Sequence, residues 1–201
     1  MLSHEKLAWV FANFTDEELL AYNENRTYGA CQNRPRLKEI AQFCVDTWSG
    51  DLVEIGALHG GTTVILAEIA RTVGRRVIVV DPFDVGISAY ADYYNMFLKN
   101  TEPWRDTIDL IKLSSMDAKA IAIVGGRGLC FAYIDGLHTY AACFSDIKTV
   151  GHCNGIIAVD DIHTEHKFSS AILRAYLDGA ALLNRIPIDN LLVREGYLVK
   201  V

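Results

Sequence analysis

From residue 51 onward, short continuous apolar runs alternate with longer segments in which apolar residues recur every three to four positions. The apolar runs predict five buried strands, at 51–56, 75–83, 107–115, 128–136 and 154–161. The intervening segments predict helices at 62–73, 89–99, 116–124, 139–150 and 167–179. Strands that are apolar on both faces and alternate with helices are typical of a parallel sheet covered on both sides. The pattern therefore predicts a doubly wound α/β fold.

The two ends of the chain follow different patterns. Apolar residues at helical spacing predict one helix near the N-terminus and a second that begins after Pro35, with a polar segment between them. We expect a helical extension, residues 1–34, that forms a lid over the site or a dimer contact, and one domain, residues 35–201. Residues 181–201 predict two antiparallel closing strands with a turn at Glu195–Gly196. The complete sheet then has seven strands and is mostly parallel.

Composition narrows the class of protein. The 201 residues are 51% apolar and 22% charged, which predicts one folded domain and excludes a disordered chain. The net charge of −6 argues against nucleic-acid and anionic-membrane partners. No apolar stretch reaches the roughly 18 residues of a membrane span, and the first residues lack the pattern of a signal peptide. The five cysteines include no C-x-x-C pair. We therefore expect a cytoplasmic protein without a disulfide framework.

Carboxylates stand at the ends of four of the five predicted parallel strands. They are Glu54, Asp81, Asp135, Asp160 and Asp161. In open parallel sheets the ligand binds beyond the carboxyl ends of the strands. Crowded carboxylates repel one another, so this acidic rim favours hydroxyl groups, an ammonium group or a divalent cation as ligands. The chain has no G-x-x-x-x-G-K-[ST] string, which argues against a phosphate-binding loop of that type.

The loop after the first strand is rich in glycine. Gly56 and Gly60 allow a tight turn and close approach of the backbone to a ligand. A dinucleotide fingerprint G-x-G-x-x-G would need glycine at Leu58. Asp81 ends the second strand, where an acid can accept hydrogen bonds from both hydroxyls of a ribose. A nucleoside is therefore a candidate ligand, whereas a pyrophosphate is not.

Three motifs carry a resemblance to a known class of enzymes. The string E-x-G-x-x-x-G-G-T at Glu54–Thr62 resembles motif I of class I methyltransferases that use S-adenosylmethionine (SAM). The strings D-G-L-H-T-Y at Asp135–Tyr140 and V-D-D-I-H at Val159–His163 are similar to one family within this class. That family includes macrolide-sugar O-methyltransferases and the proteins named cephalosporin hydroxylases. The resemblance covers about residues 35–180 and implies a Rossmann-like sheet within a SAM-dependent methyltransferase domain.

The resemblance also implies roles for particular residues. Glu54 and Gly56 would lie against the methionine part of SAM, Asp81 would bind the ribose, and Ser115 and Met116 would flank the adenine. The residues expected to bind the cofactor are Glu54, Gly56, Gly60, Thr62, Asp81, Ser115, Met116 and Asp135. The expected ligands of Mg²⁺ or another divalent cation are Asp135, Asp160 and Asp161. His138 is the expected catalytic base, with His163 and His166 as alternatives.

These residue types suit methyl transfer to a hydroxyl group. A divalent cation held by carboxylates lowers the pKa of a hydroxyl and fixes its oxygen, and a neutral imidazole can take the proton. We therefore expect a Mg²⁺-assisted O-methyltransferase that acts on a small molecule. Adjacent residues of a strand point to opposite faces, so Asp160 and Asp161 can share an ion only if the strand has already ended. Asp161 could instead serve as a turn or capping residue.

Other functions remain open at this point. An NAD-linked oxidoreductase would use a similar sheet, but Leu58 replaces the required glycine and no Tyr-x-x-x-Lys pair is present. A SAM-binding relative without catalytic activity would keep the same motifs. Nucleic-acid methylation is disfavoured by the acidic charge. We expect a homodimer or higher homo-oligomer, because an apolar N-terminal helix adjoins a small domain. The acceptor depends on residues 1–34 and 83–105, which carry no recognisable motif.

Overall fold

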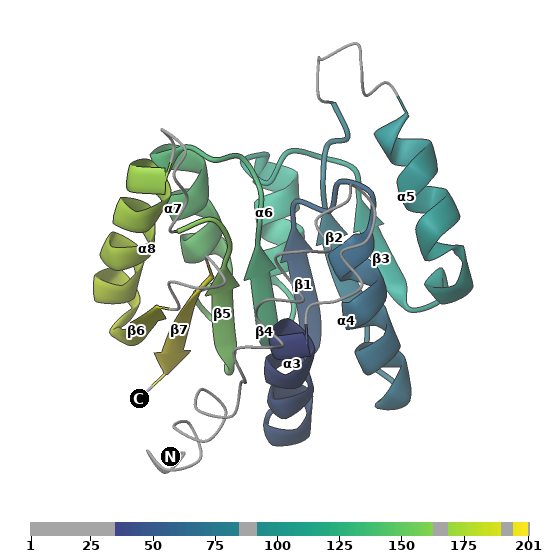
Figure 1. Ribbon diagram of the computed structural model, residues 1–201, viewed down its shortest axis with the longest axis horizontal. Helices are drawn as coiled ribbons and strands as arrows, with labels where there is room; N and C mark the ends of the chain where they lie inside the picture. Colours follow the sequence, from purple (N-terminus) through teal and green to yellow (C-terminus); the bar gives the residue numbers. More distant parts are fainter. Residues whose placement is uncertain (1–34, 85–91, 163–168, 190–194, 201) are drawn as a thin grey trace.

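A seven-stranded sheet forms the centre of the computed structural model, which describes residues 35–84, 92–162, 169–189 and 195–200 (Figure 1). The strands are β1 (Asp51–Ile55), β2 (Val77–Val80), β3 (Ile108–Ile111), β4 (Leu129–Ile134), β5 (Ile156–Val159), β6 (Arg185–Asp189) and β7 (Gly196–Lys200). Their order is β3-β2-β1-β4-β5-β7-β6. The first five in this order are parallel, and β7 is antiparallel to both β5 and β6. The predicted Rossmann-like, mostly parallel sheet is confirmed.

Helices cover both faces of this sheet, as the apolar runs predicted (Figure 1). One face is covered by α3 (Pro35–Thr47), α4 (Gly61–Thr72) and α5 (Tyr93–Thr101), which leads into the 3-10 helix η2 (Glu102–Trp104). The other face is covered by α6 (Ala118–Gly125), α7 (Tyr140–Thr149) and α8 (Ser169–Leu183). Neighbouring residues of a strand point to opposite faces, so Leu52 packs in the first core and Val53 in the second.

The C-terminal antiparallel hairpin is confirmed, but the predicted turn at Glu195–Gly196 is wrong. Helix α8 continues to Leu183, beyond the predicted end at residue 179, and Asn184 follows with a left-handed φ of 51°. Strand β7 begins at Gly196, which pairs with Val159 on one side and Asp189 on the other. Strand β6 therefore lies earlier in the sequence than expected. Its Pro187 is accommodated because β6 is the edge strand of the sheet.

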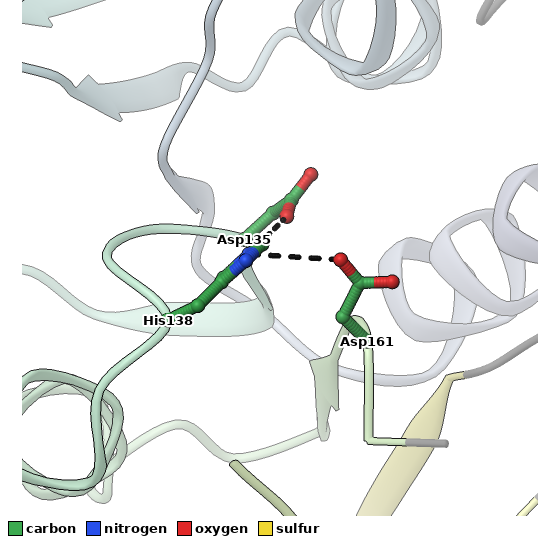
Figure 2. A group of neighbouring side chains, drawn as sticks. All are labelled: Asp135, His138 and Asp161. Atoms are coloured by element: carbon green, nitrogen blue, oxygen red, sulfur yellow. Dashed lines mark hydrogen bonds and ion pairs between the residues drawn. The ribbon is translucent and has the colours of Figure 1, made fainter. Parts of the chain in front are cut away.

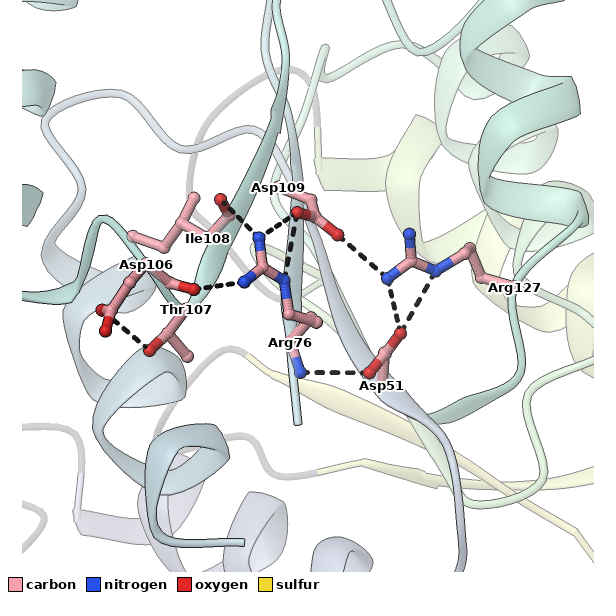
Figure 3. Close-up of polar contacts among 7 residues, drawn as sticks. All are labelled: Asp51, Arg76, Asp106, Thr107, Ile108, Asp109 and Arg127. Carbon is pink, nitrogen blue, oxygen red and sulfur yellow. Dashed lines mark hydrogen bonds and ion pairs between the residues drawn. The ribbon is translucent and has the colours of Figure 1, made fainter. Parts of the chain in front are cut away.

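The amino ends of the strands are joined by a network of ion pairs (Figure 3). Arg127, just before β4, contacts Asp51 of β1 at 2.7 Å and Asp109 of β3 at 2.9 Å. Arg76, just before β2, also pairs with Asp109, and its backbone N–H donates to Asp51 at 3.0 Å. Each arginine thus connects two strands of the sheet. The pKa of Asp109 is lowered mainly by its hydrogen bond from Arg76.

None of the helices in the described parts of the chain combines the length and apolar character that a bilayer crossing would need.

Candidate active site

Two neighbouring strands bring Asp135, His138 and Asp161 together. Asp135 directly follows β4, and Asp161 comes two residues after β5, whose last residue pairs with Ile134. His138 Nε2 lies 3.5 Å from Asp135 Oδ1 and 3.7 Å from Asp161 Oδ2 (Figure 2). One possible ligand atom from each of the three residues lies within 4.8 Å of the others. The arrangement combines two carboxylates and an imidazole at the carboxyl end of the sheet.

The surrounding carboxylates change the protonation of the histidine. The hydrogen bond with Asp135 raises the pKa of His138 above its ordinary value, and partial burial acts in the opposite direction. The charges of Asp161 and Asp160 raise it further. Two or three nearby negative charges stabilise an imidazolium. The same charges would stabilise a proton that His138 took from a substrate.

Asp160 and Asp161 both follow the end of β5, but their carboxylates lie in different surroundings. The Asp160 side chain is only 8% exposed, and its Oδ2 accepts a hydrogen bond from the Tyr133 hydroxyl at 2.7 Å. Its Oδ1 accepts the backbone N–H of Asp161 at 2.8 Å. Asp161 has a left-handed φ of 57°, and its carboxylate faces His138 (Figure 2). Of the three acids expected to bind a cation, Asp135 and Asp161 lie next to His138, whereas Asp160 is buried beside Asp161.

Asp81 organises the loop that follows β1. Its Oδ2 accepts the backbone N–H groups of Ala57 at 2.8 Å and Leu58 at 3.1 Å. Its Oδ1 accepts the N–H of Phe83 at 2.7 Å. Each carboxylate oxygen has two lone pairs, so these bonds do not exhaust the capacity of the group. The half-buried Asp81 can therefore orient the loop and still accept one hydrogen bond from a ribose hydroxyl through Oδ1.

Several residues of the first motif serve the packing of the loop itself. Glu54 is 1% exposed and accepts a hydrogen bond from the Thr63 hydroxyl of α4. Gly56 has a φ of 86°, and a Cβ there would come 2.1 Å from the carbonyl oxygen of Asp135. A Cβ on Gly60 would come 2.7 Å from Thr101 and 3.0 Å from the ring of Phe97. Thr62 is also buried. Gly56 and Gly60 thus allow segments of the protein to approach one another closely. From the sequence we expected them to allow a tight turn and the close approach of a ligand.

Ser115 and Met116 lie in the turn between β3 and α6. Ser115 is half-buried, whereas Met116 is 49% exposed. Two other apolar residues at this edge of the sheet are exposed, namely Leu58 after β1 and Leu137 after β4. Sequence reasoning singled out Leu58 only as a missing glycine and missed Leu137. Leu58 and Leu137 could have been identified from the sequence as apolar residues within polar loops. An exposed apolar side chain in such a loop is a candidate contact for an apolar part of a ligand.

Asp146 is a further acid that sequence reasoning missed. It lies on α7, is fully buried, and neither oxygen makes a hydrogen bond of ordinary geometry within the described residues. Burial raises the pKa of Asp146 to about 7, and a side-chain interaction with Ser115 acts in the opposite direction. Asp146 lines a small pocket beneath the loop that carries Asp135 and His138. The available signal was a charged residue within the apolar stripe of a predicted helix.

Some expectations concern residues outside the described parts of the chain. These are the helical extension, residues 1–34, the alternative bases His163 and His166, and residues 85–91 of the segment expected to contact the acceptor.

Comparisons with known proteins agree with this architecture. A family model described as a methyltransferase domain matches residues 53–162, which is just over half of the chain. No curated protein sequence matches the chain. Solved structures of the same fold include CalS11, a TDP-rhamnose 3′-O-methyltransferase of calicheamicin biosynthesis, with 15% identity and a TM-score of 0.64 over 96% of this chain and 90% of that one.

Two further structures are similar over nearly their whole length. The methyltransferase PaMTH1 of Podospora anserina has 13% identity and a TM-score of 0.60, over 100% of this chain and 98% of that one. An O-methyltransferase from Bacillus cereus has 16% identity and a TM-score of 0.56, over 97% and 96% respectively. At this identity the three structures establish the shared fold. Together with the family match over the site region, they lead to one assignment: this chain belongs to the methyltransferase-domain family and is a class I SAM-dependent methyltransferase.

Proposed function

We propose that this methyltransferase transfers the methyl group of SAM to a hydroxyl oxygen of a small molecule, assisted by Mg²⁺ or another divalent cation. The observation that carries the proposal is the convergence of Asp135, His138 and Asp161 beside the glycine loop after β1. Oxygen as the acceptor atom is supported by two structural neighbours, which are described as a TDP-rhamnose 3′-O-methyltransferase and an O-methyltransferase. PaMTH1 and the Bacillus cereus protein are described in complex with S-adenosylhomocysteine (SAH), the product that SAM leaves after methyl transfer.

In this proposal SAM lies across the carboxyl ends of β1, β2 and β4. Asp81 accepts one hydrogen bond from the ribose through Oδ1, and the loop that it holds supplies backbone contacts to the methionine part. Ser115 and the exposed Met116 flank the adenine. Asp135 lies close to the reacting end of the cofactor. Glu54, Gly56, Gly60 and Thr62 contribute by shaping the loop, because each of them packs against protein.

The donor groups fit a hard divalent cation. Mg²⁺ prefers oxygen ligands and keeps several of its waters, so two carboxylates suffice to bind it. Asp135 and Asp161 supply these carboxylates, with Asp160 as an additional acid beside them. The two acids repel each other when both are ionised, and a cation would relieve that repulsion. When bound, the cation would lower the pKa of the acceptor hydroxyl and fix its oxygen.

His138 acts as the base in this scheme. Its Nε2 lies 3.5 Å from Asp135 and 3.7 Å from Asp161, so it can take the proton of an acceptor hydroxyl that a cation on these two carboxylates would hold nearby. The remaining requirement of methyl transfer is alignment of the acceptor oxygen with the methyl carbon, which can contribute several kcal/mol to catalysis. Gly56 lies directly against the backbone of Asp135, which brings the proposed cofactor side and acceptor side of the site close together.

The decisive experiment is isothermal titration of SAM into the protein, with and without Mg²⁺, and with Asp81→Ala as the control. We expect SAM to bind to the wild-type protein and the variant to bind it about tenfold more weakly, because a good hydrogen bond to a charged group contributes about 1.5 kcal/mol or more. Formation of SAH with a panel of vicinal diols, with and without EDTA, then tests transfer and the need for a cation.

The outcomes separate the alternatives. If SAM does not bind under either condition, the assignment of its binding residues is wrong. If SAM binds but no hydroxyl compound yields SAH, the protein is a SAM-binding relative without catalytic activity. If Asp135→Ala and Asp161→Ala leave both cation binding and turnover intact, the proposed cation site is wrong. The homo-oligomeric state, the cytoplasmic location and the role of residues 1–34 stay predictions.

A further inference from the structure

We propose that Tyr133 is a positioning residue of this site: its hydroxyl fixes Asp160, and Asp160 in turn fixes the backbone of Asp161 so that its carboxylate faces His138. The inference rests on the proposed function, because it assigns a task to a residue behind the proposed cation site. Tyr133 lies in β4, between β1 and β5 in the sheet, and it belongs to none of the three sequence motifs.

The first step of the argument is the contact between Tyr133 and Asp160. Tyr133 pairs with Ala158 across the β4–β5 ladder, and Asp160 comes two residues after Ala158. Side chains two residues apart in extended chain lie on the same face, so Asp160 continues the face that Tyr133 occupies. The Tyr133 side chain is fully buried, and its hydroxyl donates to Asp160 Oδ2 at 2.7 Å. A hydrogen bond to a buried carboxylate is among the stronger hydrogen bonds in proteins.

The second step is the way in which Asp160 holds the turn. Its backbone N–H donates to the carbonyl oxygen of Ile134 at 2.9 Å, which extends the sheet by one residue. Its Oδ1 accepts the N–H of Asp161 at 2.8 Å. Asp160 is therefore attached to β4 through both its backbone and its side chain. Its side chain can then direct the N–H of the following residue.

The third step concerns Asp161. Its φ of 57° lies in the left-handed region, which residues other than glycine rarely adopt and which aspartate adopts when local hydrogen bonds stabilise it. The hydrogen bond from its N–H to Asp160 supplies such support. In this conformation the carboxylate lies 3.7 Å from His138 Nε2 (Figure 2). The Tyr133 hydroxyl thus acts on the site through two successive hydrogen bonds.

The test is Tyr133→Phe, which removes the hydroxyl and keeps the ring in the core. Mn²⁺ serves as the probe for a hard divalent cation, and titration calorimetry measures its affinity and that of SAM. We expect the Mn²⁺ dissociation constant to rise about tenfold, the low end for loss of a residue that orients a metal ligand. The SAM dissociation constant should stay within about twofold of the wild-type value, because the Asp81 side of the site is unchanged.

A matched control separates positioning from a general loss of stability. Tyr176 is also fully buried, and its hydroxyl donates to the carbonyl oxygen of Tyr197 at 3.2 Å. Tyr176→Phe removes a buried tyrosine hydroxyl whose hydrogen bond goes to Tyr197 and not to Asp160. We expect this control to lower the thermal unfolding temperature by a comparable amount and to leave the Mn²⁺ affinity unchanged.

A double-mutant cycle tests whether Tyr133 acts through Asp160. In the Asp160→Ala background, Tyr133→Phe should have no further effect on Mn²⁺ affinity, and an equal effect in both backgrounds overturns the inference. If the wild-type protein and Tyr133→Phe bind Mn²⁺ equally well, the inference is wrong and the proposed function stands. If the wild-type protein binds SAM but not Mn²⁺, the proposed cation is wrong and the inference falls with it.

Discussion

The two ends of the sheet both carry aspartates, but the groups that hold them differ in charge. At the amino ends, Asp51 and Asp109 are held by the guanidinium groups of Arg76 and Arg127 (Figure 3). At the carboxyl ends, the aspartates have neutral donors or a histidine among their partners. Asp81 accepts backbone N–H groups, Asp160 accepts a tyrosine hydroxyl, and Asp135 contacts His138 (Figure 2).

This difference determines what each group of acids can do. An arginine lowers the pKa of its carboxylate partner and also cancels its charge, so the pair connects strands and attracts no further cation. A neutral donor orients a carboxylate without cancelling its charge. The carboxyl-end acids therefore keep their negative charge, and the hydrogen bond with Asp135, together with the charges of Asp161 and Asp160, raises the pKa of His138. We infer that the amino-end acids serve stability and the carboxyl-end acids serve binding and catalysis.

The largest expected effect separates the two ends by activity. His138→Gln should lower kcat by about a hundredfold or more, the usual contribution of a general base, and leave SAM affinity and thermal stability nearly unchanged. His152 provides a control at the opposite end, where its Nε2 lies 2.8 Å from the carbonyl oxygen of Arg127. His152→Gln should leave kcat unchanged. If His138→Gln keeps kcat within tenfold, the base is another residue, with His163 and His166 as the next candidates.

The next prediction concerns Asp146, a buried acid of α7 that belongs to neither group and should reduce stability. Because its pKa rises from 3.8 to about 7 on folding, the folded state binds the proton more tightly than the unfolded state. The free energy of unfolding should therefore decrease as pH rises from about 4 to about 7, by up to about 4 kcal/mol. Asp146→Asn should remove this dependence and stabilise the protein at pH 8. Urea unfolding at several pH values measures this free energy for the wild-type protein and for Asp146→Asn. The same pH dependence in both proteins would contradict the prediction.

A pair of glycines tests the contact between the two sides of the site. Gly56 and Gly74 both have left-handed φ, 86° and 66°, but a Cβ on Gly74 would have no heavy atom within 4 Å. Gly74→Ala should therefore cost about 1 kcal/mol, for backbone strain alone. Gly56→Ala should cost about 3 kcal/mol, because its Cβ would overlap the backbone of Asp135. Urea unfolding measures both losses. If the two variants lose the same free energy of unfolding, the Asp135 loop moves away from the added Cβ at little cost.

The smallest effect is expected at the amino ends. Asp109→Ala should lower the free energy of unfolding by about 1–2 kcal/mol, because the side chain is 32% exposed and solvent screens its two ion pairs. The loss should shrink in 1 M NaCl, and kcat should not change. Since folding lowers the pKa of Asp109, its contribution is present above the ordinary pKa and is lost as pH falls below it. A change in kcat with unchanged stability would contradict the assignment of roles.

The sequence alone determined the type of fold and the edge at which the site lies. Buried parallel strands must be apolar on both faces, so their positions are readable as continuous apolar runs, and β1 to β5 all fall within the predicted runs. The acids that end these runs must meet at one edge because parallel strands share a direction. Local periodicity did not predict β6. This strand follows the end of α8 at Leu183 and contains Pro187, and it is defined by its pairing with β7 at the edge of the sheet.

Which partner each acid has depends on contacts that form only in the folded protein. The sequence contains the same residue type at Asp51, Asp81, Asp146 and Asp160. Asp51 is held by arginines, Asp81 by backbone N–H groups and Asp160 by a tyrosine, whereas Asp146 is buried on α7. Their partners are up to 76 residues away in sequence and become neighbours only through crossover connections and strand register. Periodicity reports whether a side chain is buried, because burial repeats with the local geometry of the chain. The charge, direction and pKa of that side chain depend on groups that folding brings from elsewhere.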